Sequence, residues 1–358
     1  MKRLVARLFV IFLAGGVAYA YWIYRDLRTP VYHNRGGQYI DIPRGSSPSA
    51  VLKRLASEGI VRHEWPLQIY LKFTGFGPRF KAGEYRFPSP ITPLAVIKKL
   101  QQGEDRLVRL TVIEGWTRWD IANAMCRVPE LGLSDPQSAL TLMDDVSLIS
   151  DIDPRATNLE GYLFPDTYEF APGTTPASLI EMMVKRFLVA WSQDWTAKAE
   201  ALKMTPREIV TTASLIETEA KLESERPIIA SVIYNRLHRE MALGVDSTVI
   251  YASKLAGKWR NDGKVYKSDV ERVSPYNTRL HIGLPPGPIA SPSASSLLAA
   301  LDPATTDYLY YVREPSRNDG AHNFYTSEKD FNQGVQALRN WERERDIENA
   351  KQKNEASK

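Results

Sequence analysis

Apolar residues form one long uninterrupted run near the N-terminus. Leu8 to Tyr24 holds 17 residues without a charge, about 25 Å as a helix, and adding Leu4 to Arg7 brings the run close to the roughly 30 Å hydrocarbon core of a bilayer. Tyrosine and tryptophan crowd its C-terminal end, as in an interfacial aromatic belt, whereas basic residues precede it. We predict a transmembrane anchor over residues 1–30 with a short cytoplasmic end. A signal peptide cleaved after Ala18-Tyr19-Ala20 is the alternative, and either way the body of the protein is exported.

Two later segments share a second pattern. In residues 39–61 and 107–126, an alternating strand runs into a turn, and a helix then opens behind a serine or threonine cap. Ala82 to Phe87 is typical of a short strand, and Thr92 to Gln102 of a helix with a threonine cap and proline in its first turn. These elements predict a small α/β domain over residues 31–105. Strand-helix-helix-strand units of this kind include the LysM modules that bind polysaccharide, and a packing or spacer domain fits the pattern equally well.

The remainder of the chain mixes strand and helix patterns until about Trp341. We therefore predict a larger mixed domain over residues 106–341 and an α+β fold class. Residues 342–358 are charged and nearly free of apolar side chains. Such a tail is either a solvated extension of a helix or disordered.

Composition excludes several classes of function. The 46 Lys and Arg residues nearly balance the 42 Asp and Glu residues, giving a formal charge of +4 without the basic run that nucleic-acid binding favours. A single cysteine, Cys126, cannot form an internal disulfide, and the five histidines show no metal-ligand spacing. The sequence also has no dinucleotide-binding loop and no serine acyl-transfer motif. We therefore expect neither a metal nor a cofactor.

The segment TTASLIETEA, Thr211 to Ala220, places two glutamates two residues apart in a helix that begins at the Thr205 cap and Pro206. Around the helix axis, Glu217 lies about 70° from the centre of an apolar stripe, and Glu219 lies about 90° from it on the opposite flank. The stripe consists of Ile209, Ala213, Ile216 and Ala220. Side chains two residues apart do not face each other, so the two glutamates do not act on one bond as a pair.

Glu217 and Glu219 therefore receive separate interpretations. Glu217 borders the apolar stripe, where partial loss of hydration favours the protonated acid and suits a proton donor. Glu219 is expected to pair with Lys221 or with solvent. From pattern alone, a glutamate at such a border is more often a salt-bridged surface group than a catalyst.

Proline-rich loops follow the helices of this region. Ser274 to Thr278 and Gly283 to Ile289 contain prolines that fix the backbone, which suits the wall of a groove. Tyr276 and Asn277 offer a flat ring and a fixed amide, which are the groups that sugars need, although both also occur in ordinary turns.

Taken together, the motifs resemble the endolytic murein transglycosylase family, MltG (YceG-like). Six blocks match in the family's order and cover most of the chain as far as about Val335, which is far more specific than one short motif. The blocks are IEGWT (Ile113 to Thr117), LEGYLFPDTYEF (Leu159 to Phe170), ASLIETEA (Ala213 to Ala220), SERPIIASVIYNRL (Ser224 to Leu237), DSTVIYA (Asp246 to Ala252) and SPYNTRLHIGLPPGPIASP (Ser274 to Pro292).

The resemblance implies an enzyme, a peptidoglycan lytic transglycosylase. Such an enzyme cleaves the β-1,4 bond between N-acetylmuramic acid (MurNAc) and N-acetylglucosamine (GlcNAc) in nascent glycan strands, leaves 1,6-anhydroMurNAc ends and so terminates the strands. Residues 106–341 would be its catalytic domain, and Glu217, the first glutamate of the A-S-x-x-E-x-E block, its essential residue. One carboxyl suffices because the muramic C6 hydroxyl is the nucleophile, so that Glu217 protonates the leaving oxygen and then accepts the hydroxyl proton.

The resemblance also implies a location and partners. The anchor would cross the bacterial inner membrane once, with the N-terminus cytoplasmic and the remaining domains periplasmic, beside glycan strands and peptidoglycan synthases. Candidate substrate contacts are Asn235, Asp246, Tyr276 and Asn277, each of which can equally be a structural cap or turn residue. In the closing block, Phe331 stands where the family usually has a second histidine, which leaves the role of that position open.

Two rival functions remain at the level of sequence. The first is a scaffold of the cell-wall synthesis machinery that binds peptidoglycan without chemistry. The second is a muramidase that uses water, which requires a second carboxylate about 5 to 9 Å from Glu217.

Overall fold

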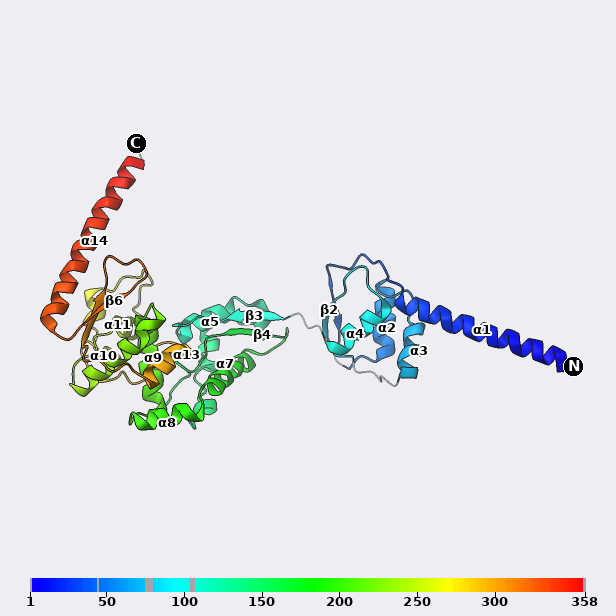
Figure 1. Ribbon diagram of the computed structural model, residues 1–358, viewed down its shortest axis with the longest axis horizontal. Coiled ribbons are helices and arrows are strands. Elements are labelled where there is room, and N and C mark those ends of the chain that lie inside the picture. The colour runs from blue at the N-terminus through cyan, green and yellow to red at the C-terminus, as the bar shows by residue number, and fades with distance from the viewer. Residues whose placement is uncertain (1, 44, 75–79, 104–106, 357–358) are drawn as a thin grey trace. The chain divides into compact units, whose positions relative to one another are not determined.

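A computed structural model describes residues 2–43, 45–74, 80–103 and 107–356 (Figure 1). The chain divides into two compact units, Met1–Val108 and Arg109–Lys358, each of which has its own packing. The predicted domain boundary between residues 105 and 106 lies outside the described residues.

The first unit combines one long helix with a small antiparallel ribbon. Tyr39 pairs with Arg86 and Ile42 pairs with Gly83, so that the two strands of the ribbon enclose two helices in sequence. The sequence patterns predicted both strands and the helices of this unit except α3 (Trp65–Thr74). The elements are α1 (Lys2–Arg28), β1 (Tyr39–Ile42), α2 (Pro48–Ser57), α3 (Trp65–Thr74), β2 (Gly83–Arg86) and α4 (Pro93–Gln102).

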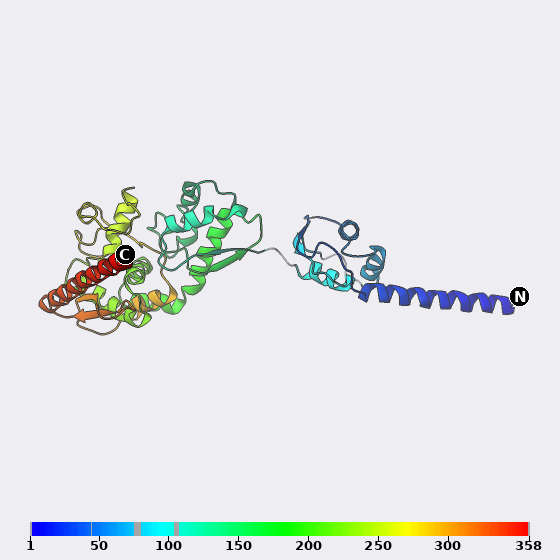
Figure 2. The ribbon, with the colours of Figure 1, turned by 90° about the horizontal axis from the view of Figure 1, so that it is seen from above.

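Helix α1 is one continuous helix (Figure 2). Its stretch Arg7–Arg28 is long and apolar enough to cross a membrane, which is consistent with a single-pass membrane protein. The C-terminal end of α1 packs on the small domain, where the rings of Tyr19 and Trp22 stack on Trp65 with centroids 5.6 Å and 5.0 Å apart. Two of the rings assigned to an interfacial belt therefore also contact α3.

The second unit is mixed α+β, as predicted. Besides its helices, it contains two further two-stranded sheets, one of β3 with β4 and one of the antiparallel β5 with β6. Strands β3 and β4 lie far apart in the sequence, whereas β5 and β6 flank one loop. The elements are β3 (Val108–Thr111), α5 (Arg118–Cys126), α6 (Pro136–Leu142), β4 (Thr167–Phe170), α7 (Pro176–Ala190), α8 (Gln193–Ala201), α9 (Pro206–Glu219), α10 (Arg226–His238), α11 (Asp246–Leu255), α12 (Lys267–Val270), α13 (Ala294–Leu301), β5 (Tyr310–Arg313), β6 (His322–Tyr325) and α14 (Glu328–Ala356), with short 3₁₀ turns at Pro129–Leu131, Ser147–Ile149 and Glu223–Glu225.

Helix α9 forms the centre of this unit. Helices α10 and α13 pack against it (Figure 1), and every residue from 209 to 216 is buried. The sequence predicted a narrow apolar stripe, whereas the structure covers the helix on all sides. Two of its buried hydroxyls bond within the helix, because that of Thr211 donates to the Arg207 carbonyl at 2.7 Å and that of Ser214 donates to the Thr211 carbonyl at 2.7 Å, whereas the Thr212 hydroxyl has no hydrogen-bond partner among the described residues.

The start of α9 is the capping box that the sequence predicts. The Thr205 hydroxyl accepts from the Glu208 N–H at 3.3 Å, the Glu208 carboxylate accepts from the Thr205 N–H at 2.8 Å, and Pro206 occupies the first turn. We expect Thr205→Ala to lower the free energy of unfolding by about 1 kcal/mol, because the Glu208 N–H loses its acceptor and the Glu208 carboxylate loses the hydroxyl as a donor. Urea unfolding of the detergent-solubilised protein measures this loss.

The control for this substitution is Thr141→Ala on the exposed face of α6, where the hydroxyl only returns to the Gln137 carbonyl of its own helix. That variant is expected to change the unfolding free energy by less than about 0.5 kcal/mol. Equal losses in the two variants would contradict the role of the capping box.

Candidate active site

Segments from distant parts of the sequence meet at the C-terminal end of α9. The N–H of Gly115 donates to the carbonyl of Ser291 at 2.9 Å, and the N–H of Ser291 donates to the carbonyl of Trp116 at 2.8 Å. These bonds join the I-E-G-W-T turn to the proline-rich loop. Gly115 adopts a φ of +76°, and a Cβ there would lie 3.9 Å from Cγ of Glu217. The turn therefore passes directly beside this glutamate.

Glu217 is nearly buried at the junction, with 5% of its side chain exposed. Its Oε1 accepts a hydrogen bond from Nη2 of Arg226 at 3.1 Å. Its Oε2 accepts from the Ser293 N–H at 2.8 Å and from the Ser293 hydroxyl. Because Ser293 caps the N-terminus of α13, the positive end of that helix also points at the carboxyl.

The surroundings of Glu217 differ from the apolar border that the sequence predicts. Burial is confirmed and more complete than expected, but the neighbours of the carboxyl are polar hydrogen-bond donors. Three donors, one of them a guanidinium N–H, form an arrangement that binds a carboxylate. A sequence pattern within α9 could not reveal this arrangement, since Arg226 and Ser293 belong to other helices.

Glu114 brings a second carboxyl to the same guanidinium. Its Oε2 lies 3.9 Å from the Arg226 Nη2 atom that binds Glu217 at 3.1 Å, so the two carboxyl oxygens are at most about 7 Å apart. Burial, followed by the charge of Glu217, raises the pKa of Glu114. Sequence reasoning did not single out Glu114, although it lies in the I-E-G-W-T block and follows a strand.

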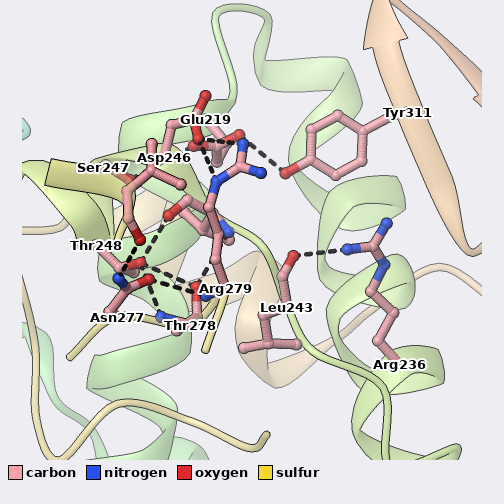
Figure 3. A network of polar contacts seen from close by, with 12 residues as sticks. Glu219, Arg236, Leu243, Asp246, Ser247, Thr248, Asn277, Thr278, Arg279 and Tyr311 are labelled. Atoms are coloured by element: carbon pink, nitrogen blue, oxygen red, sulfur yellow. Dashed lines mark hydrogen bonds and ion pairs between the residues drawn. The ribbon is translucent and has the colours of Figure 1, made fainter. Parts of the chain in front are cut away.

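Glu219 faces a different environment, on the other flank of α9 (Figure 3). The Tyr311 hydroxyl donates to its Oε2 at 2.9 Å, and the Ser247 hydroxyl donates to its Oε1 at 3.4 Å. Burial raises the pKa of Glu219. The expectation that it pairs with Lys221 or solvent is therefore wrong, because β5 and α11 cover this flank. The prediction that the two glutamates diverge is consistent with their separate partners.

The four predicted substrate contacts have separate partners in the structure. Asp246 is the first residue of α11, and its side chain is 60% exposed. Its carboxyl pairs with Arg279 (Figure 3), whose Nε donates to Oδ1 at 2.9 Å. Tyr276 is half-buried, with its ring centroid 4.9 Å from that of Tyr251. Within the described part of the chain, neither residue hydrogen bonds to Glu217.

The two predicted amide contacts serve the backbone instead. Asn277 is fully buried, and its Nδ2 donates to the carbonyls of Val270 and Arg272 at 2.8 Å and 2.9 Å, so it braces its loop and reaches no groove. Asn235 donates to the carbonyls of Thr306 and Tyr308 at 2.7 Å and 2.9 Å. It lines a cavity of about 950 Å³ at the N-terminal half of α9, whose wall does not include Glu217.

The closing block forms an aromatic cluster on the β5–β6 sheet. The ring Nδ1 of His322 lies 2.8 Å from Oε2 of Glu225, whose Oε1 accepts the His322 N–H at 2.8 Å. Phe331, at the position where a histidine was expected from the resemblance, stacks on Tyr310 with centroids 5.1 Å apart. It therefore packs the end of the sheet.

Comparison with known proteins gives the family. The model of the YceG-like family matches residues 40–337. The chain belongs to the YceG-like family. A Bacillus subtilis protein named endolytic murein transglycosylase is 38% identical over 289 residues, which cover 76% of this chain and 78% of that protein. The resemblance drawn from the six motifs is thereby confirmed.

More distant relatives agree with this assignment. An endolytic murein transglycosylase of Streptococcus pneumoniae is 28% identical over 355 residues, which cover 91% of this chain and 63% of that longer protein. The crystal structure of a putative YceG-like protein from Listeria monocytogenes aligns with a TM-score of 0.57 at 30% identity and covers 83% of this chain and 98% of its own. The mixed α+β architecture is therefore that of the family.

A further buried carboxyl, Glu160, lies in the L-E-G-Y block. Its oxygens accept the Arg118 N–H at 3.1 Å and 3.3 Å, and Oε2 also accepts from the Tyr251 hydroxyl at 3.2 Å. Burial raises the pKa of Glu160 to about 8 from its ordinary 4.5. The next residue, Gly161, has a φ of +84°, and a Cβ there would lie 2.4 Å from Pro288, so this block packs tightly against the proline-rich loop.

The buried Glu160 makes folding depend on pH. Between pH 4.5 and pH 8 the folded protein retains a proton that the unfolded chain has released, so we expect the free energy of unfolding to fall as the pH rises through this window. Glu160→Gln should flatten this fall, because an amide does not titrate. Urea unfolding at several pH values measures the effect, with Glu200→Gln on exposed α8 as the matched control. An unchanged slope in Glu160→Gln would contradict the prediction.

Proposed function

We propose that this protein is a membrane-anchored peptidoglycan lytic transglycosylase that cleaves the MurNAc-GlcNAc β-1,4 bond within nascent glycan strands. It leaves 1,6-anhydroMurNAc ends and so terminates strand growth. The observation that carries the proposal is the junction at Glu217, where the I-E-G-W-T turn, the end of the proline-rich loop and Arg226 converge on one carboxyl. Relatives named endolytic murein transglycosylase support the same activity.

The chemistry requires few groups from the protein. One proton must reach the leaving GlcNAc oxygen, and one must leave the muramic C6 hydroxyl as that oxygen closes on C1. Glu217 is the catalytic carboxyl in this proposal, and no metal or cofactor is required. The donors around Glu217 support its carboxylate form, which is the form that accepts the C6 hydroxyl proton. Glu219 has no part in the reaction, because its partners are Tyr311 and Ser247.

The rest of the chain holds the enzyme near its substrate. In our proposal α1 crosses the inner membrane with a cytoplasmic N-terminus, residues 31–105 form a LysM-like glycan-binding domain, and residues 106–341 form the periplasmic catalytic domain. The order β1-α2-α3-β2 with antiparallel strands supports the LysM-like assignment. Nascent glycan strands are the substrate, and peptidoglycan synthases are the proposed partners.

Substrate binding is assigned to exposed groups. Asp246 and Tyr276 remain the proposed sugar contacts, because part of each side chain is accessible. Asn235 and Asn277 shape the loops behind them, since their amides are occupied by backbone carbonyls.

Substitution of each glutamate separates this function from its rivals. We expect Glu217→Gln to lower the formation of anhydro ends on purified glycan strands by about 100-fold or more, because the amide neither donates nor accepts the transferred proton. Glu219→Gln should retain most activity, since burial raises the pKa of Glu219 and an amide has nearly the same shape as the protonated acid. Mass spectrometry of the released muropeptides measures both.

The products distinguish the three functions. Reducing ends in place of anhydro ends would indicate a muramidase that uses water, and an absence of products from the unmodified protein would indicate a scaffold. Equal losses in the two variants would contradict the separate roles of the glutamates.

A further inference from the structure

Three carboxyl groups surround the single guanidinium of Arg226, whose side chain is 8% exposed. Glu217 lies 3.1 Å from Nη2, Glu114 lies 3.9 Å from the same atom, and Glu223 lies 3.8 Å from Nη1. One positive charge cannot neutralise three negative charges at this range, so protonation of one carboxyl relieves the repulsion. The arrangement therefore favours one proton shared among the three groups.

The hydrogen bonds of Glu217 make it an unsuitable carrier of that proton. Both its oxygens accept from groups that only donate to it, namely Arg226, the Ser293 N–H and the Ser293 hydroxyl. The hydroxyl of Ser293 is directed toward Glu217 because its oxygen already accepts from Nη1 of Arg226 and from the Ser296 N–H. Protonation of Glu217 would remove the negative charge that these donors surround and weaken the charge-assisted bond from Arg226.

Glu114 is placed to hold and deliver the proton. Its side chain is 56% exposed, so it can approach a glycosidic oxygen, and few protein groups hold its carboxyl in the way that Arg226 and Ser293 hold that of Glu217. Its turn is fixed, because the adjacent Gly115 N–H is bonded to Ser291. Glu223 is 83% exposed and lies in a short 3₁₀ turn, so it is the least constrained of the three.

We propose that Glu114 is the general acid of the transglycosylase reaction and that Glu217 is its general base. This inference rests on the proposed function. It replaces a single carboxyl acting twice with two carboxyls that each act once. The leaving O4 and the muramic C6 oxygen both lie on the β face of the sugar ring, so the two carboxyls serve two neighbouring oxygens on one face. A separation of at most about 7 Å between the carboxyl oxygens is compatible with this arrangement.

The proton transfers balance when Glu114 acts as the acid and Glu217 as the base. The Glu114 carboxyl donates its proton to the glycosidic oxygen as the C1–O4 bond breaks, and the GlcNAc end leaves with a hydroxyl. The C6 oxygen forms its bond to C1 as its proton passes to the Glu217 carboxylate. The proton then returns from Glu217 to Glu114 through solvent, and no oxidant, reductant or water is consumed.

The electrostatic surroundings of Glu114 also favour it as the proton donor. Burial and the charge of Glu217 raise the pKa of Glu114, and Glu223 adds to the effect while Arg226 opposes it. Glu114 therefore retains its proton to higher pH than an isolated glutamate, which is the property a general acid needs.

The test uses the full-length protein in detergent and two substrates. One is a purified uncrosslinked glycan strand, and the other is a strand with 4-nitrophenol at its muramic end, whose leaving group departs without protonation. We expect Glu114→Gln to lose about 100-fold or more in kcat/KM on the natural strand and less than about threefold on the nitrophenyl strand. Glu217→Gln should lose activity on both, because the base is needed in each case.

Two controls complete the experiment. Glu200→Gln changes an exposed carboxyl on α8 that lies outside this cluster, and should keep near-normal activity on both strands. Thermal unfolding of Glu114→Gln should match that of the unmodified protein, since the side chain is largely exposed.

The outcomes separate the division of roles from the function itself. The division is overturned if Glu114→Gln matches Glu200→Gln on the natural strand, or if Glu114→Gln loses as much activity on the nitrophenyl strand as on the natural one. It is also overturned if Glu217→Gln alone keeps its activity on the nitrophenyl strand. The proposed function fails, in contrast, if the unmodified protein forms no anhydro ends.

Discussion

The buried guanidinium of Arg226 is the constraint on which the site depends. A charge with 8% of its side chain exposed has lost most of its hydration, so it needs partners of opposite charge in fixed positions. Glu217 of α9 and the hydroxyl of Ser293 at the start of α13 supply the contacts, and Glu114 completes the group from the I-E-G-W-T turn. Removing Glu217, the buried partner, would leave the guanidinium without a compensating charge in the interior, at a cost of about 3 to 5 kcal/mol.

The same helix gives its two glutamates opposite chemistry. Glu217 and Glu219 are two residues apart on α9, yet one meets donors and a positive charge, while the other is enclosed with Tyr311 and Ser247 and has a raised pKa. A difference of two residues rotates a side chain about 200° around a helix, which directs it to other tertiary neighbours. The carboxyl proposed to react and the structural one are therefore distinguished by partners on other helices and strands and not by any property of the A-S-L-I-E-T-E-A block itself.

Local features of the fold could be predicted from the sequence, and tertiary features could not. The capping box at Thr205, the strand from Tyr39 and the apolar run of α1 depend on neighbouring residues, so their patterns are legible in the chain. The partners of Glu219 come from about 28 and 92 residues away, and those of Glu217 from up to 76 residues away. Helix α3 and the all-round burial of α9 were missed for the same reason, because surrounding elements decide both.

The central claim concerns which carboxyl faces the glycosidic oxygen. A crystal structure of the inactive Glu217→Gln protein bound to a glycan strand tests it most directly. The account predicts that the glycosidic oxygen lies within about 3 Å of the Glu114 carboxyl and that the muramic C6 hydroxyl points toward residue 217. A strand bound in the cavity lined by Asn235, or a glycosidic oxygen on residue 217 with Glu114 turned to solvent, would contradict the account.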